Sequence, residues 1–80
     1  MNDELNYRDR IIRIHALCWL VGLSKSSIYA RIDPKSPYYD ETFPVGFKIG
    51  NGGRARARGW HESDVIQWIH AQEEREANNG

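Results

Sequence analysis

The spacing of apolar side chains changes several times along this chain, and each change predicts a different element of secondary structure. Residues 10–14 form a short β-branched run, which is typical of a strand. From 15 to 21 the apolar residues fall at helical spacing, and Gly22 follows as a stop signal. A second helix is expected after Ser24, a good N-cap, and it ends at Asp33 because the residue before a proline avoids the helical region.

A hairpin is predicted next. The arm 45–49 alternates apolar residues with glycine and lysine, and the dipeptide Asn51-Gly52 is a strong signal for a tight turn. The return arm, 54–58, alternates arginine with alanine, and Gly59 is expected to end it.

A last amphipathic helix is expected from about His61 to 72, with acidic residues in its first turn. The order β-α-α-β-β-α predicts an α+β fold, a small winged helix-turn-helix. We expect a flexible N-terminal arm at 1–9, the winged helix-turn-helix domain at 10–72 and an acidic, frayed tail at 73–80.

Length and composition fit one small folded domain, since 40% of the 80 residues are hydrophobic and 28% are charged. The single cysteine, Cys18, cannot form an internal disulfide, which favours a reducing compartment. No apolar run approaches the roughly 18 residues of a membrane helix, and the polar residues 1–9 do not form a secretory signal. We expect a cytoplasmic protein without a membrane contact, a cofactor or a small-molecule ligand.

Charge is segregated along the chain although its formal net value is zero. Residues 10–60 carry nine lysines or arginines against three acidic residues, whereas 1–9 and 61–80 are net acidic. A basic middle between acidic ends favours an anionic partner for the middle. The alternative is a solvated surface on which charges happen to cluster.

The segment Gly22-Leu23-Ser24 predicts the turn of a helix-turn-helix. Gly22 permits the left-handed conformation, Leu23 fills the angle between the helices, and Ser24 caps the second helix. In such a motif the second helix enters the major groove of DNA. The side chains expected to face it are Lys25, Ser26, Ser27, Tyr29 and Arg31. The alternative is a helical hairpin with solvent-exposed polar residues.

The hairpin places Arg54, Arg56 and Arg58 on one face of a strand beside a glycine-rich tip, and Lys48 can join them. Such a face suits a wing that follows phosphates or enters a minor groove. Arg54, nearest the tip, is the safest contact. The alternative for Arg56 and Arg58 is stacking or ion pairing with the neighbours Trp60, Glu62 and Asp64.

Several motifs in order are similar to the AlpA family of phage and prophage regulators, over about Arg10 to Ile69. They are Arg10-Ile-Ile-Arg-Ile14, Cys18, Gly22-Leu-Ser-Lys-Ser-Ser-Ile-Tyr29, Phe43-Pro44, Gly59-Trp60, Glu62-Ser-Asp-Val65 and Trp68-Ile69. The resemblance implies a small winged helix-turn-helix related to excisionases and MerR-type DNA-binding heads. It also implies control of integrase genes, or action as a directionality factor that favours excision.

The resemblance assigns Ser24 and the five side chains named above to the recognition helix and 51–56 to the wing. It implies that the core includes Trp60, Val65, Trp68 and Ile69. The segment 33–42 departs from the family pattern because it is longer than the simplest version. Its Tyr38 and Tyr39 are interpreted as packing residues rather than contacts, which makes 34–44 an ordered loop.

No metal site or catalytic centre is predicted. His15 and Cys18 have ligand spacing, but a zinc site normally has three or more protein ligands, so Cys18 is interpreted as a small apolar core residue. A catalytic pocket has little room in so short a chain. We expect a protein that is not an enzyme.

The expected partner is double-stranded DNA, with an integrase and further copies of the chain on DNA as additional partners. The competing hypothesis is a protein-interaction adaptor that does not bind DNA. In that case the acidic last helix and tail bind a basic partner such as an integrase, with Trp19 and Trp68 as candidate anchors.

Overall fold

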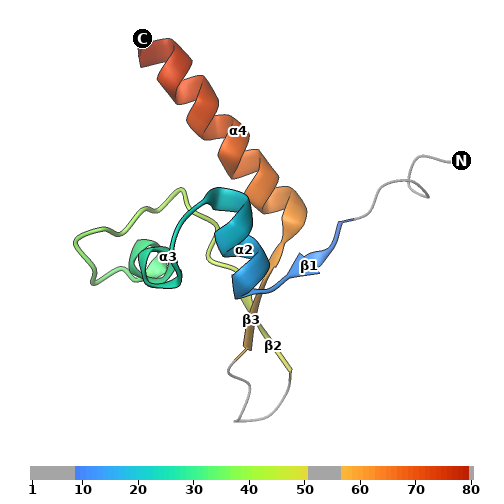
Figure 1. Cartoon of the computed structure of the whole chain (residues 1–80). Coiled ribbons are helices and arrows are strands. Elements are labelled where there is room, and N and C mark those ends of the chain that lie inside the picture. The colour runs from blue at the N-terminus through green and yellow to red at the C-terminus, as the bar shows by residue number, and fades with distance from the viewer. Residues whose placement is uncertain (1–8, 51–56, 80) are drawn as a thin grey trace, which may run out of the picture.

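The chain forms a strand, two short helices, a β-hairpin and one long helix. The computed structural model describes residues 9–50 and 57–79. In chain order the elements are β1 (Ile11–Ile12), α2 (Ile14–Val21), α3 (Lys25–Ile32), β2 (Phe47–Ile49), β3 (Ala57–His61) and α4 (Glu62–Asn79). This β-α-α-β-β-α order confirms the predicted α+β fold, a small winged helix-turn-helix (Figure 1).

β3 is the central strand of a three-stranded antiparallel sheet with the order β1-β3-β2. Its first half pairs with β2, with Lys48 opposite Arg58, and its second half pairs with β1, with Ile12 opposite Trp60. The prediction that the strand ends at Gly59 is therefore wrong. β3 continues because β1, far away in the sequence, pairs Ile11 with His61 and Ile12 with Trp60, which no local pattern reveals.

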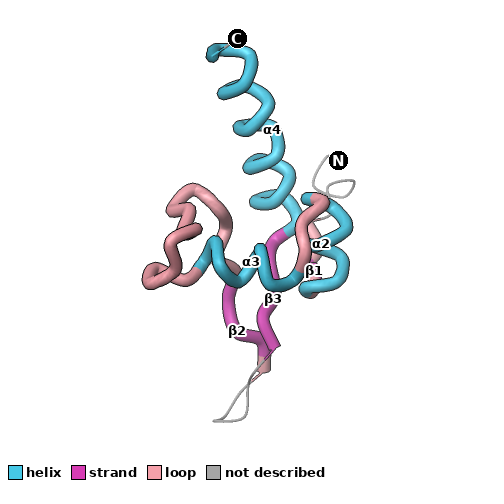
Figure 2. Tube along the Cα trace, turned by 60° about the vertical axis from the view of Figure 1, so that its left-hand side comes forward, coloured by secondary structure: helices cyan, strands magenta, loops and turns pink. Residues whose placement is uncertain are grey.

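Two other boundaries differ from the predicted ones. The β-branched run 10–14 gives only the two-residue strand β1, because α2 already begins at Ile14. At the other end of the chain, α4 continues through Asn79, although its apolar residues become rare after 72. In Figures 1 and 2, α4 extends from one end of the molecule and the hairpin from the other.

The core draws one buried side chain from each of six segments. These side chains are Ile12, Leu17, Ile28, Phe43, Trp60 and Val65. Burial of such large apolar groups contributes about 1.5–3 kcal/mol each, so removal of one segment exposes a face of all the others. Trp68 and Ile69 pack against this cluster, which confirms that the four residues implied as core lie there.

Trp60 connects the sheet to the loop that precedes it. Its indole Nε1–H donates to the carbonyl of Pro44 at 2.9 Å, so the one polar atom of this buried side chain is satisfied. Gly46, with φ 76°, passes so close that a Cβ there would lie 2.8 Å from the indole nitrogen. The start of the hairpin therefore lies directly against the core.

The first turn of α4 is held by residues that precede β1. Asp9 Oδ1 accepts from the backbone N–H of Ser63 at 3.0 Å, and Asp9 Oδ2 accepts from the Ser63 hydroxyl at 2.9 Å. Arg10 forms a two-armed contact with the Glu62 carboxylate, at 2.9 and 3.2 Å. Asp9 thus accepts a free backbone N–H at the start of α4, as an N-cap residue does, although it lies 54 residues before Ser63 in the chain.

Replacement of Gly46 by alanine is expected to lower the free energy of unfolding more than replacement of Gly22 by alanine. Both glycines have positive φ, at which a Cβ costs about 1–2 kcal/mol. At Gly46 that Cβ would also lie 2.5 Å from the Gly59 carbonyl oxygen, whereas nothing lies within 4 Å of it at Gly22. Urea denaturation measures both variants; equal losses would contradict the close approach of Gly46 to Trp60.

The Asp9→Asn substitution is expected to remove an acid-dependent part of the stability. The pKa of Asp9 lies below its usual 3.8, chiefly because the Ser63 backbone N–H donates to the carboxylate. Ionised Asp9 is therefore favoured in the folded state, so its contribution is present above about pH 4 and is lost as the pH falls through the lowered pKa. Unfolding measured between neutral and acidic pH checks this. The control Asp64→Asn, which alters an exposed carboxyl of the same turn, should keep the wild-type pH dependence.

Candidate nucleic-acid interface

The turn between α2 and α3 has the local geometry that its sequence predicts. Gly22 is left-handed, with φ 71° and ψ 29°, and its N–H donates to the carbonyl of Cys18 at 2.8 Å. Leu23 packs against the core from between the two helices. Ser24 is the N-cap of α3, and its hydroxyl accepts from the backbone N–H of Ser27 at 3.1 Å. The relative orientation of the two helices follows from these three consecutive residues.

One face of α3 packs on the core and the opposite face is open. Ile28 is fully buried, and Ile32, one turn later, packs against the same cluster. On the other side Lys25, Ser26 and Tyr29 are exposed, while Ser27 and Arg31 are half-buried. The predicted contact residues of α3 therefore lie on its outward face and flanks, where a second surface can reach them.

Arg31 is attached to the loop that follows α3. Its guanidinium lies 3.6 Å from Asp40 Oδ2, and its carbonyl accepts from the Asp40 N–H at 2.8 Å. Thr42 donates to the same carboxylate through its hydroxyl at 2.6 Å and its N–H at 2.9 Å. The hydroxyl contact is the main reason that the pKa of Asp40 lies below its usual value, with the charge of Arg31 a smaller contribution. Asp40 thus stays ionised beside Arg31.

The hairpin brings two cations together. Lys48 and Arg58 are direct partners across β2 and β3, so their side chains leave the same face of the sheet. Arg58 donates to the carbonyl of Val45 at 2.7 Å, and the Glu62 carboxylate, one of its proposed alternative partners, is bound to Arg10. Like charges directly opposite each other on neighbouring strands are destabilising, a cost that the hydrogen bond from Arg58 to Val45 has to offset within the folded chain.

The basic pair lies on the side of the sheet that carries the helices. Arg58 and Trp60 are two residues apart on β3, so both side chains point to one face, and Trp60 points into the core beneath the helices. The hairpin extends past α3 in both views of the chain (Figures 1 and 2). The structure thus brings Lys48 and Arg58 to the α3 side, while Arg54, Arg56 and the wing tip 51–56 lie outside the described residues.

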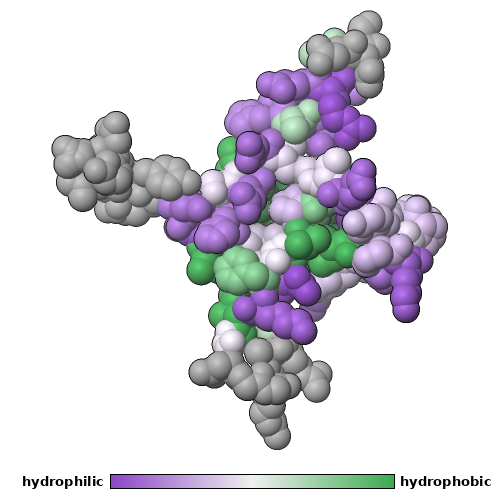
Figure 3. Space-filling model, turned by 180° about the vertical axis from the view of Figure 1, so that it is seen from behind, coloured by the Kyte–Doolittle hydropathy of each residue, from purple (hydrophilic) through white to green (hydrophobic). Residues whose placement is uncertain are grey.

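Three exposed acidic residues lie on the side of the core opposite to the hairpin. Glu73, Glu74 and Glu76 are exposed on α4, which leaves the core in the direction opposite to the hairpin (Figure 1). Seen from behind, hydrophilic residues cover α4 while hydrophobic residues gather below it (Figure 3). The acidic C-terminal part of the sequence is therefore also separated in space from the hairpin, whereas Asp33, Asp40 and Glu41 lie in the loop after α3.

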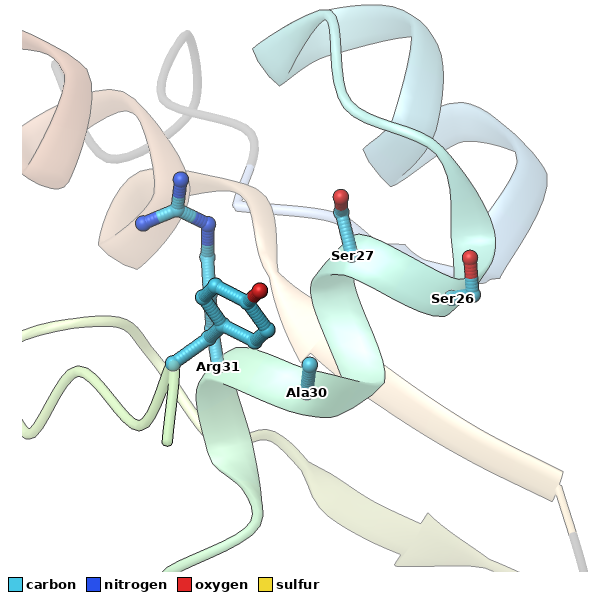
Figure 4. A pocket seen from close by; sticks show the side chains of 5 residues that line it. Ser26, Ser27, Ala30 and Arg31 are labelled. Atoms are coloured by element: carbon cyan, nitrogen blue, oxygen red, sulfur yellow. The ribbon is translucent and has the colours of Figure 1, made fainter. Parts of the chain in front are cut away.

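The loop after α3 supplies a residue that sequence reasoning assigned to packing. Tyr38 is 73% exposed and Tyr39 is 43% exposed, so the prediction that these two residues pack is wrong; Phe43 is the buried aromatic of this loop. Tyr38 lines a groove of about 300 Å³ together with Ser26, Ser27, Ala30 and Arg31 (Figure 4). The sequence signal for this loop was the unusual length of 33–42. That length indicates additional surface, but it does not reveal which way the Tyr38 side chain points.

The described part of the chain gives little support to metal binding or membrane insertion. Within 9–50 and 57–79, no three His, Cys, Asp or Glu side chains are grouped as a metal site requires. Cys18 is half-buried and packs against the core, as predicted. In the same ranges no helix is both long and apolar enough to cross a membrane.

Comparison with known proteins gives one family and one relative. The family model described as prophage CP4-57 regulatory protein (AlpA) matches residues 10–73. The chain is 35% identical over 60 residues to a protein of Escherichia coli strain K12 named DNA-binding transcriptional activator AlpA. That alignment covers 75% of this chain and 80% of the relative. No solved structure matches the chain significantly.

Replacement of Lys48 by glutamine is expected to stabilise the fold slightly. Removal of one of two facing cations should raise the free energy of unfolding by about 0.2–1 kcal/mol at low salt. The gain should shrink at high salt, because exposed charges are then screened. Thermal unfolding at two salt concentrations measures it, with Lys35→Gln as control for the loss of one lysine from the exposed surface. A loss of stability in Lys48→Gln would contradict the repulsion.

Proposed function

The chain belongs to the AlpA family of prophage regulatory proteins, and we propose that it is a regulator that binds double-stranded DNA sequence-specifically. The observation that carries the proposal is the facing pair Lys48 and Arg58, on the side of the sheet where α3 presents its open face. An anionic partner bound near the two cations would offset their repulsion. The name of the E. coli relative, a DNA-binding transcriptional activator, supports the same partner.

In this proposal α3 enters the major groove and the hairpin follows the adjacent backbone. α3 spans eight residues, and an α-helix, about 10–12 Å across with its side chains, fits the width of that groove. Its first turns direct Lys25, Ser26 and Tyr29 to base edges, with Ser27 and Arg31 on the flank. Lys48, Arg58 and the wing arginines Arg54 and Arg56 neutralise phosphates, which gives affinity without sequence preference. No step of this function is catalytic.

Within that function, we place the protein in the cytoplasm of a host that carries a mobile genetic element. There it acts on integrase or excision genes, as a transcription regulator, a recombination directionality factor or both. These roles use the same contacts, because each requires this domain to bind DNA at a defined site. One such domain covers a short site, which favours cooperative binding of several copies at repeated sites.

The second candidate function is a protein adaptor, and one observation favours it. Trp19 on α2 is 83% exposed, although tryptophan is the side chain most enriched where proteins contact each other. Trp68, the other candidate anchor, instead packs edge-on against Phe43, with ring centroids 4.8 Å apart. An adaptor that contacts an integrase through Trp19 can also bind DNA through α3.

Gel-shift binding tests the proposal with DNA from upstream of the protein's own gene and of any adjacent integrase gene. Wild type should give discrete shifts that resist competitor DNA and weaken as salt rises. Arg31→Ala should bind about 10- to 100-fold more weakly, because it removes a hydrogen bond between charged groups, which contributes about 1.5–3 kcal/mol. Lys48→Gln should lose affinity equally for target and unrelated DNA, with the slope of log affinity against log salt reduced by about 1.

The matched control is Arg75→Ala, which removes the same charge from the acidic helix α4 and should bind as wild type. The absence of any shift at low salt, from wild-type protein shown to be folded, would refute DNA binding. Equal losses in Arg31→Ala and Arg75→Ala would show that net charge alone governs binding, and would refute the assigned surface.

A further inference from the structure

The loop after α3 is ordered by hydrogen bonds within the loop and to α3. Asp33 and Ser36 each turn the chain by accepting a backbone N–H two residues later, from Lys35 and Tyr38, both at 3.0 Å. Asp40 closes the loop back onto α3 through its N–H bond to the Arg31 carbonyl. Phe43 then enters the core. The loop therefore holds its side chains at defined positions relative to α3.

These positions place Tyr38 next to the outward face of the helix. The groove that it forms with α3 has one wall from Ser26, Ser27, Ala30 and Arg31, and in Figure 4 the side chains of Ser26, Ser27 and Arg31 point to the same side of the helix. With Tyr38 at 73% exposure, its ring gains little from burial. An aromatic residue held out of the core beside a candidate contact surface needs a reason other than packing.

The lining of the groove suits a phosphate. It offers three hydroxyls and one guanidinium, all able to donate hydrogen bonds, and the alanine leaves the space between them open. The neighbouring carboxylate of Asp40 is turned to Thr42 and Arg31, with which it already makes its contacts. Asp40 does not line the groove, although its carboxylate lies 3.6 Å from the guanidinium.

The length of α3 indicates which part of DNA reaches this place. α3 has little more than two turns, so if its first turn reads bases, its last turn lies about 6 Å further along, closer to the wall of the major groove. That wall is the sugar-phosphate backbone. We propose that the 33–42 loop is a third DNA-contacting element, in which Tyr38 and Arg31 together bind a backbone phosphate of the DNA that α3 enters. This proposal rests on the proposed function.

The chain contains a matched control for this proposal in the adjacent residue. Tyr39 belongs to the same loop, but it lines a different groove, with Asp40, Glu41, Thr42 and Arg75. That groove borders α4 and is rich in carboxylates, so it does not suit a phosphate. The adjacent residues Tyr38 and Tyr39 thus line two different grooves, one with hydrogen-bond donors and one with carboxylates.

The test compares Tyr38→Phe with Tyr39→Phe in gel shifts, on the DNA that wild type binds and on unrelated DNA. Loss of the Tyr38 hydroxyl should weaken binding about fivefold, which corresponds to one hydrogen bond, and equally on both DNAs, since phosphates carry no sequence. The salt slope should stay unchanged because tyrosine is neutral. Tyr39→Phe should bind as wild type. Circular dichroism confirms that both variants fold.

A second measurement locates the contact on the DNA. Methylphosphonate placed at single backbone positions of the target should, at one position, weaken wild type but have a reduced effect on Tyr38→Phe. Wild-type affinity in Tyr38→Phe overturns the loop proposal while DNA binding through α3 stands. A loss confined to the target DNA overturns the phosphate in favour of a base contact. Failure of wild type to bind any DNA refutes the proposed function itself, which the Tyr38 comparison cannot do.

Discussion

The buried indole of Trp60 is the constraint on which the arrangement of the DNA-facing elements depends. Its N–H is satisfied by the Pro44 carbonyl, its ring excludes any side chain at Gly46, and its strand position pairs with Ile12. These contacts attach the start of the hairpin, the middle of the sheet and β1 to one core. Because Arg58 lies two residues before Trp60 on the same strand, the orientation of the basic pair follows from the burial of the indole.

Beyond this core, local costs accumulate on the surface that we assign to DNA. Lys48 and Arg58 repel each other, and Tyr29 and Tyr38 expose aromatic rings that folding alone would bury. The start of α4 shows no such cost, because Asp9 accepts from Ser63 and Arg10 pairs with Glu62. A domain of 80 residues has little stability to spare, so the repulsion and the exposed tyrosines on this side favour a binding surface here, while Trp19 marks a separate exposed site on α2.

Sequence reasoning succeeded where the determining contacts are local. The left-handed Gly22, the Ser24 cap and the alternation along the hairpin each depend on residues within a few positions, so the order of elements and the outward side chains of α3 were predictable. It failed where the partner is distant. The continuation of β3 past Gly59 depends on β1, and the direction of Tyr38 depends on how the loop closes onto Arg31.

Charge is distributed unevenly over the fold, although the chain as a whole is formally neutral. Lys25, Lys48 and Arg58 lie on α3 and the hairpin, whereas Glu73, Glu74 and Glu76 lie on α4, on the other side of the core. Asp33, Asp40 and Glu41, in the loop after α3, are the exception to this separation. In the DNA-binding mode that we propose, this separation favours an approach with α3 forward and α4 pointing away from the DNA. In that orientation the exposed carboxylates of α4 act on the approach without touching DNA, and Trp19 stays accessible to another protein.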